Sequence, residues 1–277
     1  KGIVSGELRP ENLKISGSRA KDNINLSSDA HLKDFKFSSD SDGDPSIDSL
    51  DCDLKVKQHF ASSNNFMFSS SGKCAADEFF WDKTGAVQNI VSRVDLSSNK
   101  KWSDNKISLS NIRSKYMEGS ASGTLNFFLS KGFGGGITKI TGDIIGNNLN
   151  LEMTPKTVIP ANIAGNAEFA SASFEGGSSN YKADISLIIN NFLLKSNRGR
   201  EFKVSKLQTK EPIDFEYKSL SEEDQNSDNS TQDEILIKGK GVSYQQLAFE
   251  EYLINNGTVK DLDFLLELSK DKWTLHM

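Results

Sequence analysis

Four aspartates near the start of the chain form the sharpest cluster of metal-ligating residue types. Asp40, Asp42 and Asp44 alternate in the stretch SSDSDGDPSIDSLDCD, residues 38–53, and Asp48 follows them. Carboxylate oxygens at this spacing can converge on a calcium ion. The glycine comes one place early for an EF-hand loop, however, and the twelfth position holds no glutamate. The cluster therefore predicts either a calcium site or an acidic hairpin tip built on the Asp-Gly turn.

The glycine-rich stretch GFGGG, residues 132–136, raises the question of phosphate binding. A phosphate-binding loop needs backbone N–H groups at a helix N-terminus, with a lysine and a serine or threonine at fixed spacing. The residues that follow, ITKITGDII, alternate as in a strand, and no GKS or GKT sequence occurs there. We therefore expect these glycines to form a turn or bulge between two strands.

Catalytic and nucleic-acid-binding signals are weak. The chain has no GxSxG or HExxH sequence, although two of its many carboxylates could still form a glycosidase pair, which is defined only by position in space. The net charge is −5, from 33 basic and 38 acidic side chains, and no basic stripe is present. The sequence therefore favours a non-catalytic protein that needs no cofactor and binds no nucleic acid.

The two cysteines, Cys52 and Cys74, lie in or beside strand-like segments. They could form one disulfide in an oxidising compartment or remain as two buried thiols. Their spacing does not fit a zinc site, and the chain offers only three histidines as further ligands.

The elements that must position these residues are strands. Apolar and polar residues alternate in segments that recur every 10–15 residues, with turn signals such as Asp-Gly and Gly-Asn-Asn between them. Antiparallel sheets can leave one face in water, whereas parallel sheets are usually covered on both faces. The pattern predicts an all-β, mostly antiparallel meandering sheet that forms one elongated domain over residues 1–277.

Three segments depart from this alternation. Residues 75–82 (AADEFFWD) are compatible with one or two helical turns. Residues 243–256 carry a capping-box pattern but also alternate near their end, so they could be a helix or strands. Residues 219–233 are acidic and almost free of apolar side chains, which predicts a mobile loop inserted in one sheet.

Each predicted strand has one apolar face, and this face needs a cover. Apolar residues make up only 36% of the chain, which is low for an ordinary core. The sheet could fold on itself as a β-sandwich, close as a barrel, or curl into an open groove, in which acyl chains replace a second sheet. The candidate groove residues are Phe127, Leu129, Leu149, Leu151, Met153, Ile185, Leu187 and Ile189.

Three stretches carry a resemblance to a known family. They are SGELRPENLKISGSRAKDNINLSSDAHLKDFKF (5–37), GSASGTLNFFLSKGFGGGITKITGDIIGNNLNLEM (119–153) and YLINNGTVKDLDFLLELS (252–269). Their glycine-punctuated alternation, and the Asn-Gly turn followed by Asp-Leu in the last stretch, resemble the AsmA-like and TamB-like envelope proteins.

The resemblance implies an open β-groove that carries phospholipid through the Gram-negative periplasm. It also implies contact with membrane-embedded envelope proteins and an inner-membrane anchor. The chain begins at Lys1 and has no apolar run near the roughly 20 residues that span a bilayer, so we expect any anchor outside it. The alternatives are a surface or extracellular β-sandwich for adhesion or glycan binding, with calcium at the aspartate cluster, and a β-rich hydrolase.

Overall fold

The computed structural model describes most of the chain as long strands. The described residues are 2–18, 23–39, 45–61, 65–82, 84–98, 105–130, 136–155, 162–177, 180–195, 200–218, 232–249, 252–269 and 272–276. They fall into two compact units, Lys1–Ile140 and Thr141–Met277, which we describe separately. The loop predicted at 219–233 lies outside the described residues up to 231, and residues 232–233 begin a strand.

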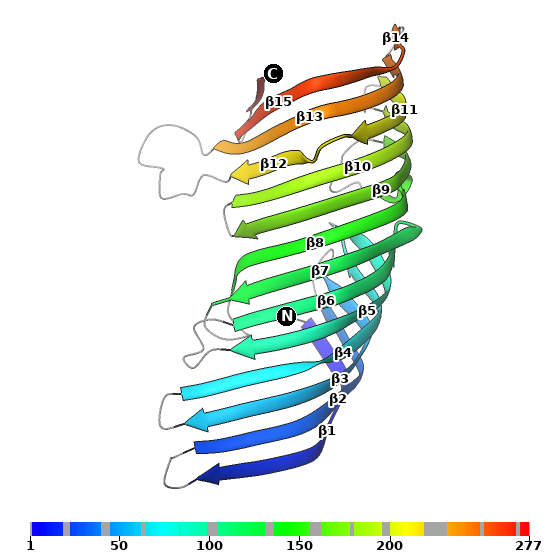
Figure 1. Ribbon diagram of the computed structural model, residues 1–277. Helices are drawn as coiled ribbons and strands as arrows, with labels where there is room; N and C mark the ends of the chain where they lie inside the picture. The colour runs from blue at the N-terminus through cyan, green and yellow to red at the C-terminus, as the bar shows by residue number, and fades with distance from the viewer. Residues whose placement is uncertain are drawn as a thin grey trace. The chain divides into compact units, whose positions relative to one another are not determined.

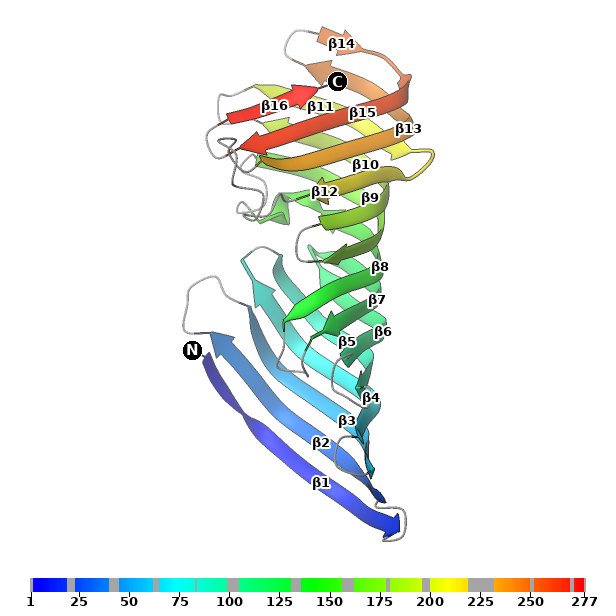
Figure 2. The same cartoon turned by 90° about the vertical axis from the view of Figure 1, so that its left-hand side faces the viewer.

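The first unit is an antiparallel meander in which each strand pairs with the next one along the chain. Its strands run side by side and are strongly curved (Figures 1 and 2). They are β1 (Gly2–Ser18), β2 (Asn23–Ser39), β3 (Ser46–Ala61), β4 (Asn65–Trp81), β5 (Gly85–Ser98), β6 (Asn105–Tyr116), β7 (Gly119–Leu129) and the first residues of β8 (Ile137–Asn150).

The second unit continues the same up-and-down pattern. After β8 and a 3₁₀ helix, η3 (Leu151–Met153), the strand order is β9-β10-β11-β13-β15-β16. β12 pairs with β10 and β13 beyond the end of β11, so β11 and β12 act as two halves of one interrupted strand. The bounds are β9 (Asn162–Gly177), β10 (Asn180–Lys195), β11 (Glu201–Thr209), β12 (Ile213–Lys218), β13 (Gln232–Phe249), β14 (Tyr252–Ile254), β15 (Gly257–Ser269) and β16 (Lys272–His276).

The predicted all-β, antiparallel meander is confirmed. The helical turns expected at residues 75–82 are not formed, because residues 75–81 complete strand β4. Of the two alternatives for residues 243–256, the structure has strands, and residues 243–249 complete β13. The capping-box pattern therefore does not begin a helix there. Within the described residues, no helix is long and apolar enough to cross a membrane.

The glycine-rich segment joins two strands, as predicted. Ser130 N–H donates to the carbonyl oxygen of Gly136 at 3.1 Å, which links the end of β7 to the start of β8. Residues 131–135 lie outside the described part of the chain.

Neither unit has a conventional core. The described strands all belong to one sheet, and the elements in extensive contact are sheet neighbours, or β9 and the adjacent η3. The chain exposes 18323 Å². Two separate globular domains of half its mass of 30.5 kDa would together expose about 14,000 Å². The β-sandwich alternative therefore does not describe the units, since each is a single curved layer.

Candidate functional site

A repeated bulge keeps the apolar residues of each strand on one face. From Leu109 to Ile112, β6 advances three residues while its partner β7 advances only two, from Leu125 to Gly123. The same extra residue occurs in β1, β2, β5 and β10. An extra residue bends the bulged strand and increases its local twist. Because two consecutive polar residues share the polar face at each bulge, that face is longer, and the strand curves toward the apolar side.

The bulges have a signature in the backbone and in the sequence. Each contains a residue with a positive φ near 50°, a conformation in which Asn and Asp are enriched among non-glycine residues. Each of these residues is the third of a tetrad that in most cases begins and ends with an apolar residue, such as VQNI (87–90), LSNI (109–112) and INNF (189–192). The left-handed residues at the bulges are Asn12, Asp34, Ser49, Asn89, Asn111 and Asn191, and Asn148 and Gln246 have the same backbone conformation.

The apolar face of the first unit is continuous across its strands. Residues that are directly paired in an antiparallel sheet project from the same face. One such row crosses β1 to β6 through six paired positions, which at about 4.8 Å per strand gives a length of about 24 Å. Its members are Val4, Phe37, Ile47, Phe79, Val87 and Tyr116.

The predicted groove residues Phe127 and Leu129 belong to this face. Phe127 pairs with Ile107, which in turn pairs with Leu96. Leu129 pairs with Asn105, and both side chains are buried. Burial raises the pKa of the Tyr116 hydroxyl, which donates to the carbonyl oxygen of Thr84 at 3.0 Å. The face is thus apolar enough to disfavour a charged phenolate.

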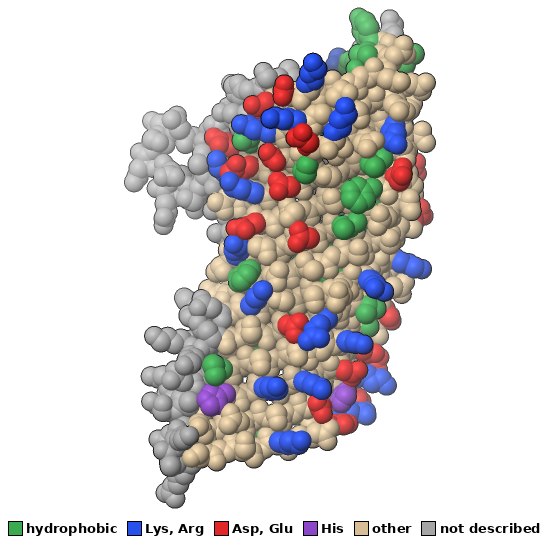
Figure 3. Space-filling view, in the orientation of Figure 1, with side chains coloured by type: hydrophobic (Ala, Val, Ile, Leu, Met, Phe, Trp, Pro, Cys, Tyr) green, Lys and Arg blue, Asp and Glu red, His purple; other side chains and the backbone are tan. Residues whose placement is uncertain are grey.

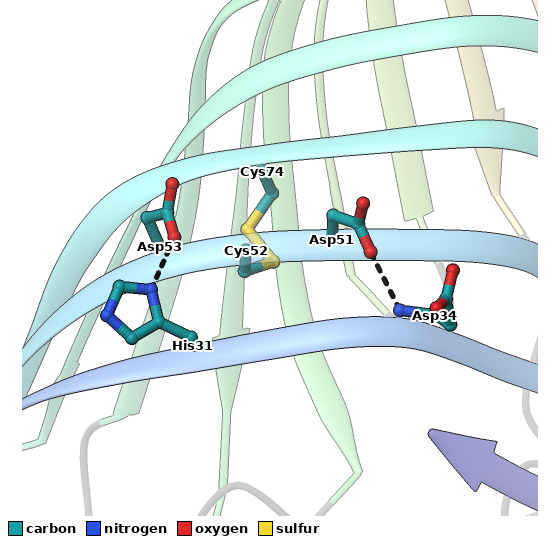
Figure 4. Close-up of a disulfide and its surroundings, with 6 residues drawn as sticks. All are labelled: His31, Asp34, Asp51, Cys52, Asp53 and Cys74. Carbon is teal, nitrogen blue, oxygen red and sulfur yellow. Dashed lines mark hydrogen bonds and ion pairs between the residues drawn. A yellow bond between two sulfur atoms is a disulfide. The ribbon is translucent and has the colours of Figure 1, made fainter. Parts of the chain in front are cut away.

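A disulfide joins Cys52 and Cys74 at directly paired positions of β3 and β4 (Figure 4). Both cysteines are buried, and they lie in a row with Leu32 on the apolar face. Of the two alternatives that the sequence left open, the structure therefore has the bonded one, and the described residues contain no free cysteine.

The second unit has an apolar face of the same kind. The predicted residues Ile185, Leu187 and Ile189 lie together on β10 and are half-buried. Ile185 pairs with Ile213 of β12, and Ile189 pairs with Leu207 of β11. Beyond the bulge at Asn191, the face continues through two further rows. These rows are Phe192, Val204, Leu247, Ile254 and Leu194, Phe202, Phe249, Tyr252.

The predicted set Leu149, Leu151 and Met153 is only partly correct. Leu149 lies in β8, but the strand ends at Asn150, whose side-chain oxygen accepts a hydrogen bond from Glu152 N–H at 3.1 Å. Leu151 and Met153 therefore lie in the 3₁₀ helix and not on a strand face, and Met153 is exposed. The alternation of three apolar residues concealed this asparagine cap.

The opposite face of each sheet is polar and charged (Figure 3). His31 Nδ1 lies 2.6 Å from Asp53 Oδ1, and this hydrogen bond raises the pKa of His31, with Glu11 and Asp29 adding to the effect (Figure 4). In the second unit, Lys203 and Lys195 lower the pKa of Glu201. These pairs are exposed, so each adds little to stability, but together they keep this face in water.

The structure gives no support to the calcium prediction where it can be examined. Asp40, Asp42 and Asp44 lie outside the described residues, while Asp48 is ion-paired with Lys36 at 2.6 Å. The described part of the chain contains no group of three acidic, histidine or cysteine side chains that could hold a metal ion. A hollow of about 470 Å³ beside the break between β11 and β12 is lined by five carboxylates, two lysines, a proline and a glycine.

The bulge tetrads are the functional feature that the alternation of apolar and polar residues did not reveal. In LKDF (32–35), VQNI, LSNI and INNF they were visible in the sequence as a polar pair ending in Asn or Asp between two apolar residues, and each interrupts the alternation of its strand once. The chain was also compared with protein-family models, with curated proteins and with solved structures, and no match was found in any of the three.

Proposed function

We propose that this chain binds the acyl chains of lipids along the apolar faces of its two units, without catalysis, as part of a lipid-transport protein of the cell envelope. The observation that carries the proposal is the uncovered row from Val4 to Tyr116 in the first unit. It is continuous over six strands, apolar along its length, and backed by a charged face. A ligand for such a face must be apolar and elongated and must bind without specific side-chain contacts. An acyl chain has these properties.

The energetics favour an apolar ligand on this face. Most of its large side chains are half-buried and not fully enclosed, so they still contact water. Removing apolar surface from water contributes roughly 25 cal/mol per Å², or about 0.8 kcal/mol for each buried methylene. An acyl chain that lies along a row gains this free energy of burial for many of its methylene groups at once. Its headgroup remains in water at the rim, where polar groups need no buried partner.

The disulfide supports a location in an oxidising compartment. Disulfides persist in secreted and periplasmic proteins and are rare in reducing cytosol. Cys52 and Cys74 cross-link two neighbouring strands in the apolar face, where the bond fixes part of the lining. We place the protein in the periplasm, where phospholipid would be its ligand and membrane-embedded envelope proteins its partners.

The test uses two valines of strand β5 that lie on opposite faces. Val94 pairs with Leu109 on the apolar face, whereas Val91 is 50% exposed and pairs with Arg113 on the polar face. Val94→Asp places a charge on the proposed lipid track, and Val91→Asp is the matched control. Wild type and both variants are incubated with phospholipid vesicles, separated from them and analysed by native mass spectrometry and lipid extraction.

We expect bound phospholipid in wild type and in Val91→Asp, and at least a tenfold loss in Val94→Asp. Circular dichroism checks that the variants fold, and Val94→Thr, which changes polarity at nearly constant volume, replaces Val94→Asp if that variant unfolds. The proposal would be wrong if the wild-type protein took up no lipid. It would also be wrong if Val94→Asp and Val91→Asp took up equal amounts.

A further inference from the structure

The hairpin between β13 and β15 carries an apolar tip that the sheet does not cover. Tyr252, Leu253 and Ile254 form β14 and are 71%, 69% and 49% exposed, and Phe249 at the end of β13 is 40% exposed. Large apolar side chains gathered in the open mark an interaction site. The tip lies within the second unit, and hydrophobic side chains are visible there at the end of the molecule that carries β14 (Figure 3).

The tip is apolar on both faces of the strand, which separates it from the rest of the sheet. Tyr252 pairs with Phe249, and Ile254 pairs with Leu247, so these two residues extend the apolar face. Leu253 pairs with Ala248 and projects from the opposite face, which is polar elsewhere in the unit. A protein partner that packs on one face of a strand would leave either Leu253 or its two neighbours in water. An apolar medium that surrounds the tip would cover all three residues.

The residue types at the tip and the charge of the chain indicate which apolar environment surrounds the tip. Tyrosine is enriched where an apolar ring meets a wet polar boundary, as at a membrane interface. The whole chain has a net charge of −5. A net negative charge opposes association with an anionic lipid surface. The chemistry therefore fits the interface of a bilayer made of zwitterionic lipids.

We propose that the β14 tip inserts into the interface of a zwitterionic lipid bilayer and docks the chain there. The docking itself is independent of lipid bound along the sheet. A role of this docking in lipid transfer rests on the proposed function. The row from Leu194 through Phe202 and Phe249 to Tyr252 would then lead acyl chains from the apolar face to the membrane.

Flotation with phosphatidylcholine vesicles tests the docking. The tip variant is Leu253→Asp with Ile254→Asp. The matched control is Ile3→Asp with Val91→Asp, which removes two exposed apolar residues from the polar face of the first unit. We expect wild type and the control to float with the vesicles and the tip variant to lose at least tenfold in the bound fraction. Replacing phosphatidylcholine by phosphatidylglycerol should weaken wild-type binding.

A second readout follows the tip directly. An environment-sensitive fluorophore attached through Leu253→Cys should shift to the blue when phosphatidylcholine vesicles are added, and the same label attached through Ile3→Cys, on the polar face of β1, should not. Vesicle binding that is equal in wild type and the tip variant, or absent from wild type, overturns the docking. So does a concentration-dependent dimer, lost in the tip variant without vesicles, since a second copy would then cover the tip.

The same samples distinguish this proposal from the previous one. If the tip variant keeps its lipid in native mass spectrometry but no longer floats, docking and lipid binding are separate properties, as we expect. If Val94→Asp loses its lipid and still floats, the substitution removes lipid binding by the apolar face and leaves vesicle binding by the tip intact. Loss of flotation in the tip variant while wild type carries no lipid would support docking and contradict the lipid track.

Discussion

At the scale of single residues, the two faces of the sheet impose opposite chemistry on neighbouring positions. Cys52 lies buried in the apolar face, while Asp51 and Asp53 on either side of it are exposed. Asp51 accepts a hydrogen bond at 2.7 Å from the backbone N–H of Asp34, the left-handed residue in the bulge of β2 (Figure 4). A side chain's role is therefore decided by which face it occupies and not by its residue type alone.

His31 gives a pH-dependent prediction. Its hydrogen bond to Asp53 raises its pKa above the ordinary 6.5, so the folded state binds the proton more tightly than the unfolded chain does. The stabilisation is fully present below pH 6.5 and is lost as the pH rises through the raised pKa of the folded state. Asp53→Asn should lower the pKa of His31 in an NMR titration and flatten this pH dependence of stability. An unchanged pKa would contradict the assignment, and Asp95→Asn serves as a control.

At the scale of elements, the bulge is the unit that shapes the sheet. A strand with perfect alternation would keep its apolar face but would have no reason to bend at a fixed point. One extra polar residue in β1, β2, β3, β5, β6 and β10 supplies this bend and leaves the apolar side continuous. In the second unit Asn191, Ser205 and Gln246 lie at corresponding positions of β10, β11 and β13, and Ser205 Oγ donates to Gln246 Oε1 at 2.8 Å.

Asn111 tests the role of the left-handed residue. Its φ is 54° and its side chain is exposed. The main requirement at this position is therefore a residue that adopts the left-handed backbone conformation. Asn111→Val should lower the free energy of unfolding by about 1–2 kcal/mol, because a β-branched residue is strained there. Asn111→Gly should be nearly neutral, and Ser110→Val, at the neighbouring position without positive φ, should cost little. Urea unfolding measures all three, and equal costs for the two valine variants would contradict this account.

At the scale of the whole molecule, contacts are made almost entirely between neighbours. The described elements in extensive contact are sheet neighbours, apart from the adjacent β9 and η3, and the chain exposes 18323 Å². Proteins built in this way gain their stability from a sum of nearest-neighbour terms and do not depend on one shared core. Local opening should therefore stay local.

Hydrogen exchange followed by mass spectrometry measures this locality. We expect Val94→Asp to speed amide exchange in β4, β5 and β6, which surround the substitution, and to leave β9 to β13 of the second unit unchanged. The edge strand β1 should exchange faster than β3 in wild type, because one of its two sides has no partner strand within the described residues. Faster exchange throughout both units would indicate a single cooperative structure and contradict the prediction.

The sequence by itself determined the all-β class, the antiparallel order and the apolar positions Phe127, Leu129, Ile185, Leu187 and Ile189. It could do so because alternation with period two is a local property of a strand with one wetted face. With only two cysteines the sequence allowed a single disulfide pairing, but whether Cys52 and Cys74 are bonded was decided by the structure.

Only the tertiary structure decided that each unit is a single layer, because the same alternation serves a sandwich and an open sheet equally well. It also showed that residues 75–81 and 243–249 belong to strands and not to helices. Pairing with a neighbouring strand settles that choice, and pairing joins residues far apart in the chain. The exposed tip at Tyr252 to Ile254 follows from the same cause, since exposure depends on which strands lie beside it.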